Sequence, residues 1–188
     1  LIYHTTPWRG LELLLKVFKK INKENVELNV CSSTIIYGKK FHDSYEKKFK
    51  KIFDDCKKTK NINFYGYKDN SSIVEMLKEV HIFSYPSIWI ETSCISAIEA
   101  MAAGCEVVTT NLGALKETCS PFAKFVDFEK NLHNLELNYL SSLIDSINNY
   151  WSEDNQQKLK KQREIINKIY SWETRKVEWI DFLKKIKS

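Results

Sequence analysis

The chain has 188 residues, 43% of them hydrophobic, and a formal net charge of +5 at pH 7. This size allows about one domain with a substantial core, and no apolar run approaches the roughly 20 residues of a membrane-spanning helix. The first residues lack both a signal peptide and an initiator methionine, so we expect a fragment of a longer protein. Five cysteines without a Cys-x-x-Cys spacing favour reduced thiols in a cytoplasmic protein over a zinc site or a disulfide framework.

Positive charge gathers in two stretches, residues 39–60 and 158–188, and the segment between them is acidic. Basic stretches can bind nucleic acid, but solvated helix faces in a lysine-rich sequence explain them better, so we expect no nucleic-acid partner. A peripheral role at a membrane surface, near lipid acceptors, stays open for one of the two stretches.

Short apolar runs alternate with helical segments along the chain. The expected strands are residues 1–3, 26–31, 61–65, 80–85, 106–110 and 122–128. The expected helices are residues 11–21, 41–60, from Ser71 or Ser72 as cap to about 79, 92–103, 135–150 and, as one or two helices, 154–187. This alternation predicts an α/β fold with a parallel sheet and helices on both faces. Ligands of such folds bind at the carboxyl ends of the strands, in the strand-to-helix turns.

The first of these turns carries a cation, Arg9, immediately before a helix. Helix N-termini attract phosphate, and an arginine placed there adds a bidentate donor, while Thr5 and Thr6 offer hydroxyls. A salt bridge at the surface explains Arg9 equally well from this turn alone. The third turn brings Tyr67 and Lys68 to the same edge of the sheet, where a base could rest against the backbone.

The fourth turn carries the strongest signal. Ser93 is expected to cap a helix from Thr92 to Ala103, whose first N–H groups would face the space above the sheet. Glu99 lies inside this otherwise apolar helix, where an unpaired carboxylate would cost several kcal/mol. It needs donors, from ribose hydroxyls or else from a lysine or backbone N–H groups. Glu91, in the loop before the helix, can accept hydrogen bonds from sugar hydroxyls.

In this arrangement the chain resembles the carboxyl-terminal, donor-binding domain of the retaining GT-B glycosyltransferases of family four. The resemblance covers essentially the whole chain and implies a Rossmann-like, three-layer α/β fold. The residues that carry it are Arg-Gly at 9–10, Tyr-Pro-Ser at 85–87, the E-x7-E pair Glu91 and Glu99, Glu-Ala-Met-Ala-Ala-Gly at 99–104, Val-Val at 107–108, Gly113, Glu117 and Ser-Trp-Glu at 171–173 inside a terminal helix.

The resemblance implies a nucleoside diphosphate sugar as donor substrate, with no metal and no other cofactor. Arg9 would contact the diphosphate, Tyr67 and Lys68 would flank the base, and Glu99 would bind the ribose. Glu91 and the following N–H groups would contact the sugar and the phosphates, and Glu91 and Arg9 would be the catalytic pair. The implied donor-binding residues are Thr6, Arg9, Tyr67, Lys68, Glu91, Thr92, Ser93, Cys94, Ile95 and Glu99.

Three positions depart from the family pattern: His4 replaces a second cation, Glu-Thr-Ser-Cys at 91–94 replaces Glu-Gly-Phe-Gly, and Glu106 replaces a proline. Residues 1–188 are expected to form one nucleotide-sugar-binding domain, with the amino-terminal, acceptor-binding domain absent from this chain. The expected function is transfer with retention to a glycan or lipid-linked acceptor, as in polysaccharide biosynthesis, by a protein of which this fragment alone is inactive. The alternative is a non-catalytic nucleotide-binding or partner-docking module; a sugar-nucleotide epimerase is a weaker one.

Overall fold

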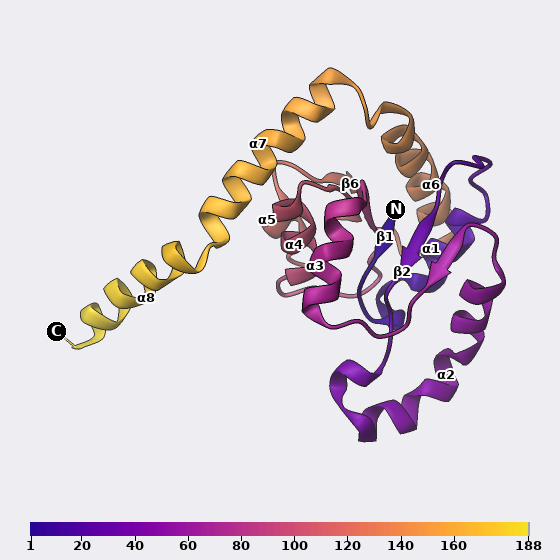
Figure 1. Cartoon of the computed structure of the whole chain (residues 1–188), viewed down its shortest axis with the longest axis horizontal. Helices are drawn as coiled ribbons and strands as arrows, with labels where there is room; N and C mark the ends of the chain where they lie inside the picture. The colour runs from indigo at the N-terminus through magenta and orange to yellow at the C-terminus, as the bar shows by residue number, and fades with distance from the viewer. Residues whose placement is uncertain (188) are drawn as a thin grey trace.

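Six short parallel strands form one sheet in the order β3-β2-β1-β4-β5-β6 (Figure 1). This is a computed structural model, and it describes residues 1–187. The strands are β1 (Ile2–Tyr3), β2 (Leu28–Val30), β3 (Ile62–Phe64), β4 (Ile82–Tyr85), β5 (Glu106–Thr110) and β6 (Lys124–Val126). Most strand residues are buried, as expected for apolar runs covered on both faces. The predicted α/β class with a parallel sheet is confirmed.

Helices cover both faces because the parallel strands are joined by crossover helices and the strand order reverses direction between β1 and β4. Contacts between the elements place α1, α2 and α6 on one face and α3, α4 and α5 on the other, where α7 crosses α4 (Figure 1). The helices are α1 (Leu11–Phe18), α2 (Lys39–Lys58), α3 (Asn70–Glu79), α4 (Ile95–Ala103), α5 (Leu115–Cys119), α6 (Leu132–Asn149), α7 (Glu153–Tyr170) and α8 (Trp172–Lys187). Two 3-10 turns, η1 (Pro7–Arg9) and η2 (Ile35–Tyr37), precede α1 and α2.

Buried tyrosines tie the layers together. Tyr139, on α6, is fully buried; its hydroxyl donates to the Val108 carbonyl at 2.7 Å and lies 3.0 Å from Ser84 Oγ. Helix α6 is therefore linked to both β4 and β5 by a single side chain. All five cysteines are buried and none is bonded to another among the described residues.

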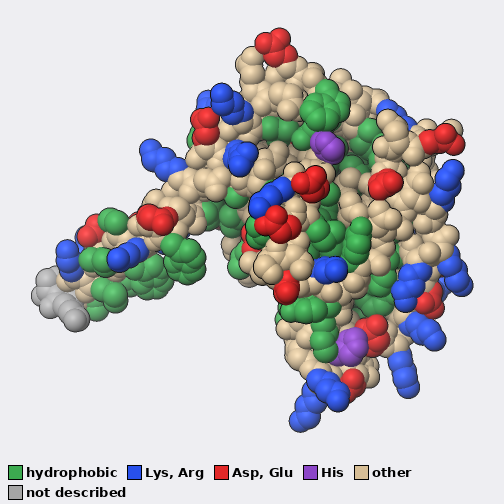
Figure 2. Space-filling model, in the orientation of Figure 1, with side chains coloured by type: hydrophobic (Ala, Val, Ile, Leu, Met, Phe, Trp, Pro, Cys, Tyr) green, Lys and Arg blue, Asp and Glu red, His purple; other side chains and the backbone are tan. Residues whose placement is uncertain are grey.

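The last two helices run away from the sheet. Helix α7 still packs on α4, but α8 extends beyond the body of the molecule (Figure 1). Figure 2 shows apolar side chains gathered along the lower edge of α8. Its exposed large apolar residues are Trp172, Val177, Trp179, Ile180, Phe182, Leu183 and Ile186. Within residues 1–187, no helix is both long and apolar enough to cross a membrane.

Most predicted elements are present, with bounds that differ by at most three residues and that match at both ends for β5. The prediction that Ser71 or Ser72 caps α3 is wrong, because the Asp69 carboxylate accepts the Ser72 N–H at 2.8 Å and starts the helix at Asn70. The short helix α5 was not predicted. Ser171 separates α7 from α8 and accepts the Thr174 N–H at 3.2 Å, so the Ser-Trp-Glu sequence begins a new helix instead of lying inside one.

Candidate functional site

A cavity of about 480 Å³ opens at the carboxyl edge of the sheet. It lies beside β1 and β4, which are neighbours in the sheet but continue in opposite directions, β1 to β2 and β4 to β5. Open α/β sheets bind ligands at such a switch point. Four strand-to-helix turns and the helices after them supply its lining: His4, Thr5, Thr6, Arg9, Cys31, Ser33, Ile36, Tyr37, Gly66, Tyr67, Lys68, Asn70, Ile73, Ser93, Cys94, Ile95, Ser96 and Glu99.

The structure brings together residues as far apart in the sequence as Thr6 and Glu99. Eight of the ten residues expected to contact a donor line this cavity: Thr6, Arg9, Tyr67, Lys68, Ser93, Cys94, Ile95 and Glu99. The other two, Glu91 and Thr92, do not line it. Glu91 is buried behind Arg9, and Thr92 is exposed.

The turn after β1 holds buried polar atoms that no described group satisfies. Thr6 Oγ1, His4 Nε2 and Arg9 Nε are buried and have no hydrogen-bond partner among residues 1–187. Burial lowers the pKa of His4 to about 4, although a contact with Ser96 opposes the shift. His4 is therefore neutral at neutral pH, and it supplies no positive charge in the place of the family's second cation. The unpaired atoms leave capacity for a polar ligand in the cavity.

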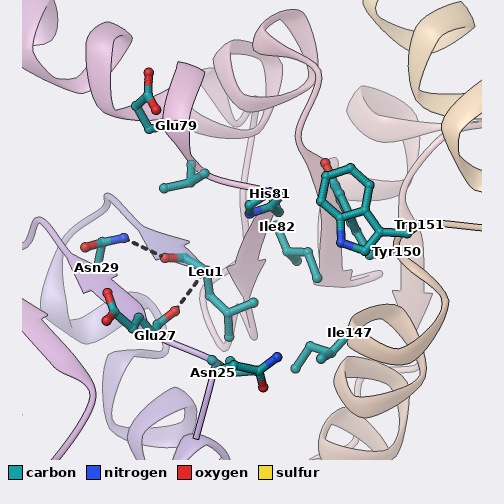
Figure 3. A pocket seen from close by; sticks show the side chains of 12 residues that line it. Leu1, Asn25, Glu27, Asn29, Glu79, His81, Ile82, Ile147, Tyr150 and Trp151 are labelled. Carbon is teal, nitrogen blue, oxygen red and sulfur yellow. Dashed lines mark hydrogen bonds between the residues drawn. The ribbon is translucent and has the colours of Figure 1, made fainter. Parts of the chain in front are cut away.

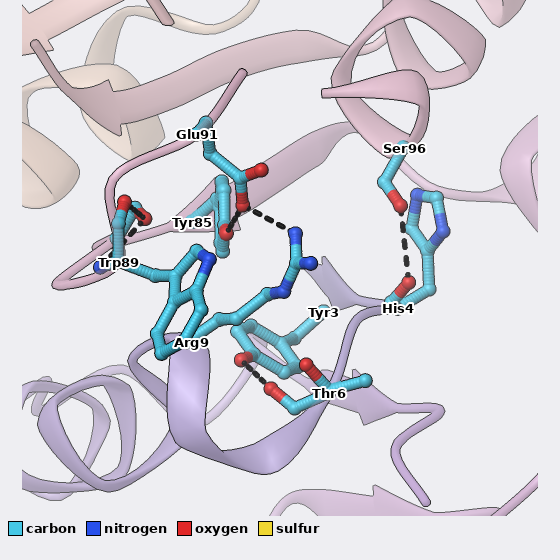
Figure 4. A network of polar contacts seen from close by, with 9 residues as sticks. Tyr3, His4, Thr6, Arg9, Tyr85, Trp89, Glu91 and Ser96 are labelled. Carbon is cyan, nitrogen blue, oxygen red and sulfur yellow. Dashed lines mark hydrogen bonds and ion pairs between the residues drawn. The ribbon is translucent and has the colours of Figure 1, made fainter. Parts of the chain in front are cut away.

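Arg9 reaches from this turn to a carboxylate 82 residues along the chain. Its Nη1 donates to Glu91 Oε1 at 2.5 Å, and the Tyr85 hydroxyl donates to the same oxygen (Figure 4). Glu91 is 4% exposed and Tyr85 is fully buried. Burial lowers the pKa of Arg9, but the charges of Glu91 and Tyr85 and the hydrogen bonds with them together outweigh this effect and raise the pKa above its usual value. Burial, followed by the bond to Glu91, raises the pKa of Tyr85.

Two glycines allow the turns around Glu91 to approach one another. A Cβ at Gly10, whose φ is +131°, would lie 2.1 Å from the Pro86 carbonyl oxygen. A Cβ at Gly113, whose φ is +62°, would lie 2.5 Å from the Glu91 carbonyl oxygen. The Ile88 N–H donates to the Arg9 carbonyl at 3.3 Å, and the Ala114 N–H donates to the Glu91 carbonyl at 2.8 Å. The Glu91 loop is thus held between the turns that follow β1 and β5.

Helix α4 begins later than the sequence predicts. It starts at Ile95, and its N-cap is Cys94, whose side chain makes no capping hydrogen bond. The prediction that Ser93 caps the helix is wrong, because the chain stays non-helical through a bridge between Glu91 and Gly113 and turns only afterwards. The N-terminus of α4, with its partial positive charge, forms one wall of the cavity.

Glu99 lies in the second turn of α4 and is partly buried. Burial raises its pKa, and a contact with the Asn70 side chain opposes this shift. Asn70 is the first residue of α3 and lines the same cavity, and sequence reasoning missed it. On the adjoining wall, Tyr67 and Lys68 are both exposed, and Lys68 Nζ lies 5.6 Å from the centre of the Tyr65 ring.

The turn after β2 contributes a wall that the sequence analysis did not identify. Ile36 and Tyr37 line the cavity and are 65% and 51% exposed. The Tyr37 ring packs against Trp8 and Phe41, with centroids 5.6 Å and 5.3 Å away. An apolar Ile-Ile-Tyr run in an otherwise polar turn was the signal that could have indicated this wall.

A second cavity, of about 380 Å³, lies at the opposite, amino edge of the sheet (Figure 3). Aromatic rings of His81, Tyr150 and Trp151 pack edge to face along it, and the amine of Leu1 donates to the Glu27 carbonyl at 2.7 Å. None of the residues expected at a donor site lies there. Across the part of the chain that the structure describes, no group of three or more His, Cys, Asp or Glu side chains is placed to hold a metal ion.

Several solved structures share this architecture. Sucrose-phosphate synthase from Thermosynechococcus elongatus superposes with a TM-score of 0.72 at 16% identity, over 98% of this chain and 45% of that chain. HepE from Anabaena, solved with UDP-glucose, superposes with a TM-score of 0.71 at 13% identity, over 98% of this chain and 48% of HepE. The pneumococcal O-GlcNAc transferase GtfA, solved with UDP and GlcNAc, superposes with a TM-score of 0.70 at 10% identity, over 98% of this chain and 35% of GtfA. At these identities the likeness establishes the fold.

The chain therefore spans half or less of the length of these structural neighbours. Its fold is that of the carboxyl-terminal half of a GT-B glycosyltransferase. No curated protein sequence matches the chain. A family model described as "Glycosyl transferases group 1" matches residues 2–158, which include the whole sheet and the cavity at its carboxyl edge. The chain belongs to the group 1 glycosyl transferases.

Proposed function

We propose that the carboxyl-edge cavity binds a nucleoside diphosphate sugar, whose glycosyl group is transferred with retention to a glycan or lipid-linked acceptor. The observation that carries this proposal is the convergence on one cavity of Arg9, an unpaired buried hydroxyl on Thr6 and the N-terminus of α4. Together they offer hydrogen-bond donors and positive potential to a diphosphate. HepE was solved with UDP-glucose, which supports a donor of this class.

In the proposed reaction the bond between the anomeric carbon and the diphosphate oxygen breaks, and the electron pair leaves with the diphosphate. The acceptor oxygen bonds to the same face of that carbon, and its proton passes to a phosphate oxygen of the leaving group. Arg9 and the N–H groups at the start of α4 stabilise the charge that develops on the diphosphate. Given these donors and the family resemblance, we propose that transfer needs no metal ion.

Two carboxylates have separate proposed roles. Glu99, partly buried in the cavity wall, accepts hydrogen bonds from the ribose hydroxyls. Glu91 lies just outside the cavity lining, and its proposed contact with the transferred sugar would use Oε2, because the contacts with Arg9 and Tyr85 both use Oε1 (Figure 4). Tyr67 and Lys68 flank the base.

The acceptor is proposed to bind an amino-terminal domain of the longer protein. The neighbours are at least twice as long as this chain, and the exposed apolar side chains of α8 offer a surface for such a domain. A cytoplasmic location, with contact to a membrane surface through a basic stretch, is part of the same proposal.

Calorimetry with UDP, GDP and ADP tests the donor site in the 188-residue chain. We expect one of the three to bind with a submillimolar dissociation constant, and we expect Glu99→Ala to weaken it about tenfold. The donor-site proposal fails when none binds at millimolar concentration. Hydrolysis of nucleotide sugars by the full-length protein, with and without EDTA, then tests transfer chemistry and the expected independence from metal.

A second candidate is a non-catalytic nucleotide-binding or partner-docking module. Two observations favour it: the neutral state of His4, and the side chains of Thr92 and Cys94 at the two positions where the family pattern has glycine. Nucleotide binding without donor hydrolysis by the full-length protein would select this candidate.

A further inference from the structure

Tyr85 is a buried residue next to the cavity that the proposed function leaves without a role. Its hydroxyl donates to Glu91 Oε1, the same oxygen that accepts from Arg9 Nη1 (Figure 4). Tyr85 and Glu91 do not line the cavity, whereas Arg9 does. An effect of the Tyr85 hydroxyl on a ligand in the cavity therefore passes through Arg9, which Tyr85 influences by way of Glu91 and also by its own proximity.

The position of the Tyr85 ring is strongly constrained. Tyr85 is the last residue of β4, and its ring packs against Tyr3 and Phe83, with centroids 6.1 Å and 5.6 Å away. The Tyr3 hydroxyl in turn donates to the Thr6 carbonyl at 2.7 Å. The hydroxyl that holds Glu91 is therefore mounted on the rigid centre of the sheet, and a site built on such an element is held more precisely than one built on loops alone.

Arg9 is fixed at both ends but keeps free donors. Its backbone N–H donates to the Thr6 carbonyl at 3.2 Å, and its carbonyl accepts the Ile88 N–H at 3.3 Å. At the other end, Nη1 is held by Glu91. A guanidinium carries five N–H donors in one plane, so fixing Nη1 orients the rest of that plane. Nε is buried and has no partner among the described residues.

We propose that Tyr85 is a positioning residue that acts through Glu91 to fix the guanidinium plane of Arg9, so that its remaining donors meet the phosphate oxygens of the ligand. The identity of that ligand rests on the proposed function, but the positioning itself does not. Without the hydroxyl, Glu91 keeps a single side-chain partner and Arg9 gains freedom that phosphate binding must then remove.

The binding test compares Tyr85→Phe with Tyr139→Phe. Both substitutions remove one hydroxyl from a fully buried tyrosine, but the Tyr139 hydroxyl contacts Val108 and Ser84, outside the cavity lining. We expect Tyr85→Phe to weaken the binding of UDP and of inorganic pyrophosphate about tenfold. Tyr139→Phe should change both affinities by less than about twofold. In an Arg9→Met background, Tyr85→Phe should have no further effect. Equal losses in the two single variants, or an undiminished loss with Met at position 9, would overturn the proposal.

A measurement without ligand separates this inference from the proposed function. Solvent exchange of the Arg9 Nε–H, followed by NMR, should be slow in the wild-type chain and in Tyr139→Phe and faster in Tyr85→Phe. An exchange rate that Tyr85→Phe leaves unchanged would overturn the positioning role. This measurement does not need the Arg9→Met variant, so it decides the question even if that variant does not fold. If exchange responds as expected but no nucleotide or pyrophosphate binds, the positioning role stands and the proposed function fails.

Discussion

The two edges of the sheet each hold a cavity, and the cavities differ in chemistry far more than in size. The amino-edge cavity has about 380 Å³ and is walled by aromatic rings packed edge to face and by strand ends (Figure 3). The carboxyl-edge cavity has about 480 Å³ and is lined by polar groups from four turns. Three residues of the turn after β1, namely His4, Thr6 and Arg9, have buried polar atoms without a partner among the described residues.

The difference follows from the direction of parallel strands. Each strand leaves at the carboxyl edge toward the N-terminus of the next helix. The N-termini of α1 to α6, with their partial positive charge, therefore lie at that edge. Volume alone does not distinguish the two cavities, but unpaired donors and helix N-termini do.

The largest expected effect comes from closing the contact that builds the carboxyl-edge site. Gly10→Val would place a side chain against the Pro86 carbonyl, so we expect a loss of about 3 kcal/mol in the free energy of unfolding together with loss of nucleotide binding. Gly38→Val is the matched control, because Gly38 also has a positive φ, of +90°, but has no atom within 4 Å of an added Cβ. Urea unfolding of both variants measures the difference; similar losses would mean that strain alone, and not the close approach, accounts for Gly10.

The next effect is the pH dependence of stability, which compares His4 at the carboxyl edge with His81 at the amino edge. The folded pKa of His4 is about 4, below the ordinary 6.5, so the unfolded chain takes up a proton that the folded chain refuses. The stability associated with neutral His4 is complete above pH 6.5 and is lost as the pH falls toward 4, by about 2 kcal/mol between pH 7 and pH 5. Urea unfolding at both pH values should show this loss in wild type and not in His4→Asn.

His81 supplies the control at the amino edge. Burial lowers its pKa too, but its ring is far more exposed than that of His4. His81→Asn should therefore keep most of the acid sensitivity of the wild type. Equal acid sensitivity in wild type and His4→Asn would contradict the assignment.

A smaller effect is expected from a carboxylate at each edge. Glu99→Gln should weaken the affinity for a nucleoside diphosphate about fivefold, because an amide accepts fewer and weaker hydrogen bonds from ribose hydroxyls. Glu79→Gln changes a carboxylate that lines the amino-edge cavity and should leave the affinity unchanged. Isothermal titration of both variants compares the edges directly, and an equal response would remove the ribose role of Glu99.

The smallest effect is expected from Lys68. Its side chain is exposed, so solvent screens its charge, and Lys68→Ala should weaken nucleotide binding only about twofold to threefold. Lys78→Ala, on the exposed face of α3, is the control and should have no effect. The same titrations at about 50 mM and about 500 mM salt should show a smaller effect of Lys68→Ala at the higher concentration. A difference in affinity that persists at high salt would argue for a direct contact.

The sheet and its helices could be predicted because their signal is local. Short apolar strands of two to five residues separated by amphipathic segments leave few alternatives to a parallel sheet. Cap positions were less predictable, because Asp69 and Ser72 are both good capping residues and the sequence does not say which one begins the helix. Helix α5, with five residues, is too short to show a period.

The contact between Arg9 and Glu91 shows where local reasoning stops. Each residue was predicted as part of the site, but their pairing depends on β1 lying beside β4 and on two glycines that bring the turns together. Tyr85 was noticed only as part of a Tyr-Pro-Ser sequence, because nothing local shows that its hydroxyl points at a carboxylate. Such contacts follow from topology and cannot be read from spacing.

The pairing of Arg9 with Glu91 also affects how fast a ligand can arrive. The charged groups in and behind the cavity wall are Arg9 and Lys68 against Glu99 and Glu91, so their formal charges cancel. The cavity wall itself therefore adds little to the long-range attraction of an anion, which comes instead from the formal net charge of +5 on the whole chain. Retention of a diphosphate here would depend on short-range fit to Arg9 and the start of α4.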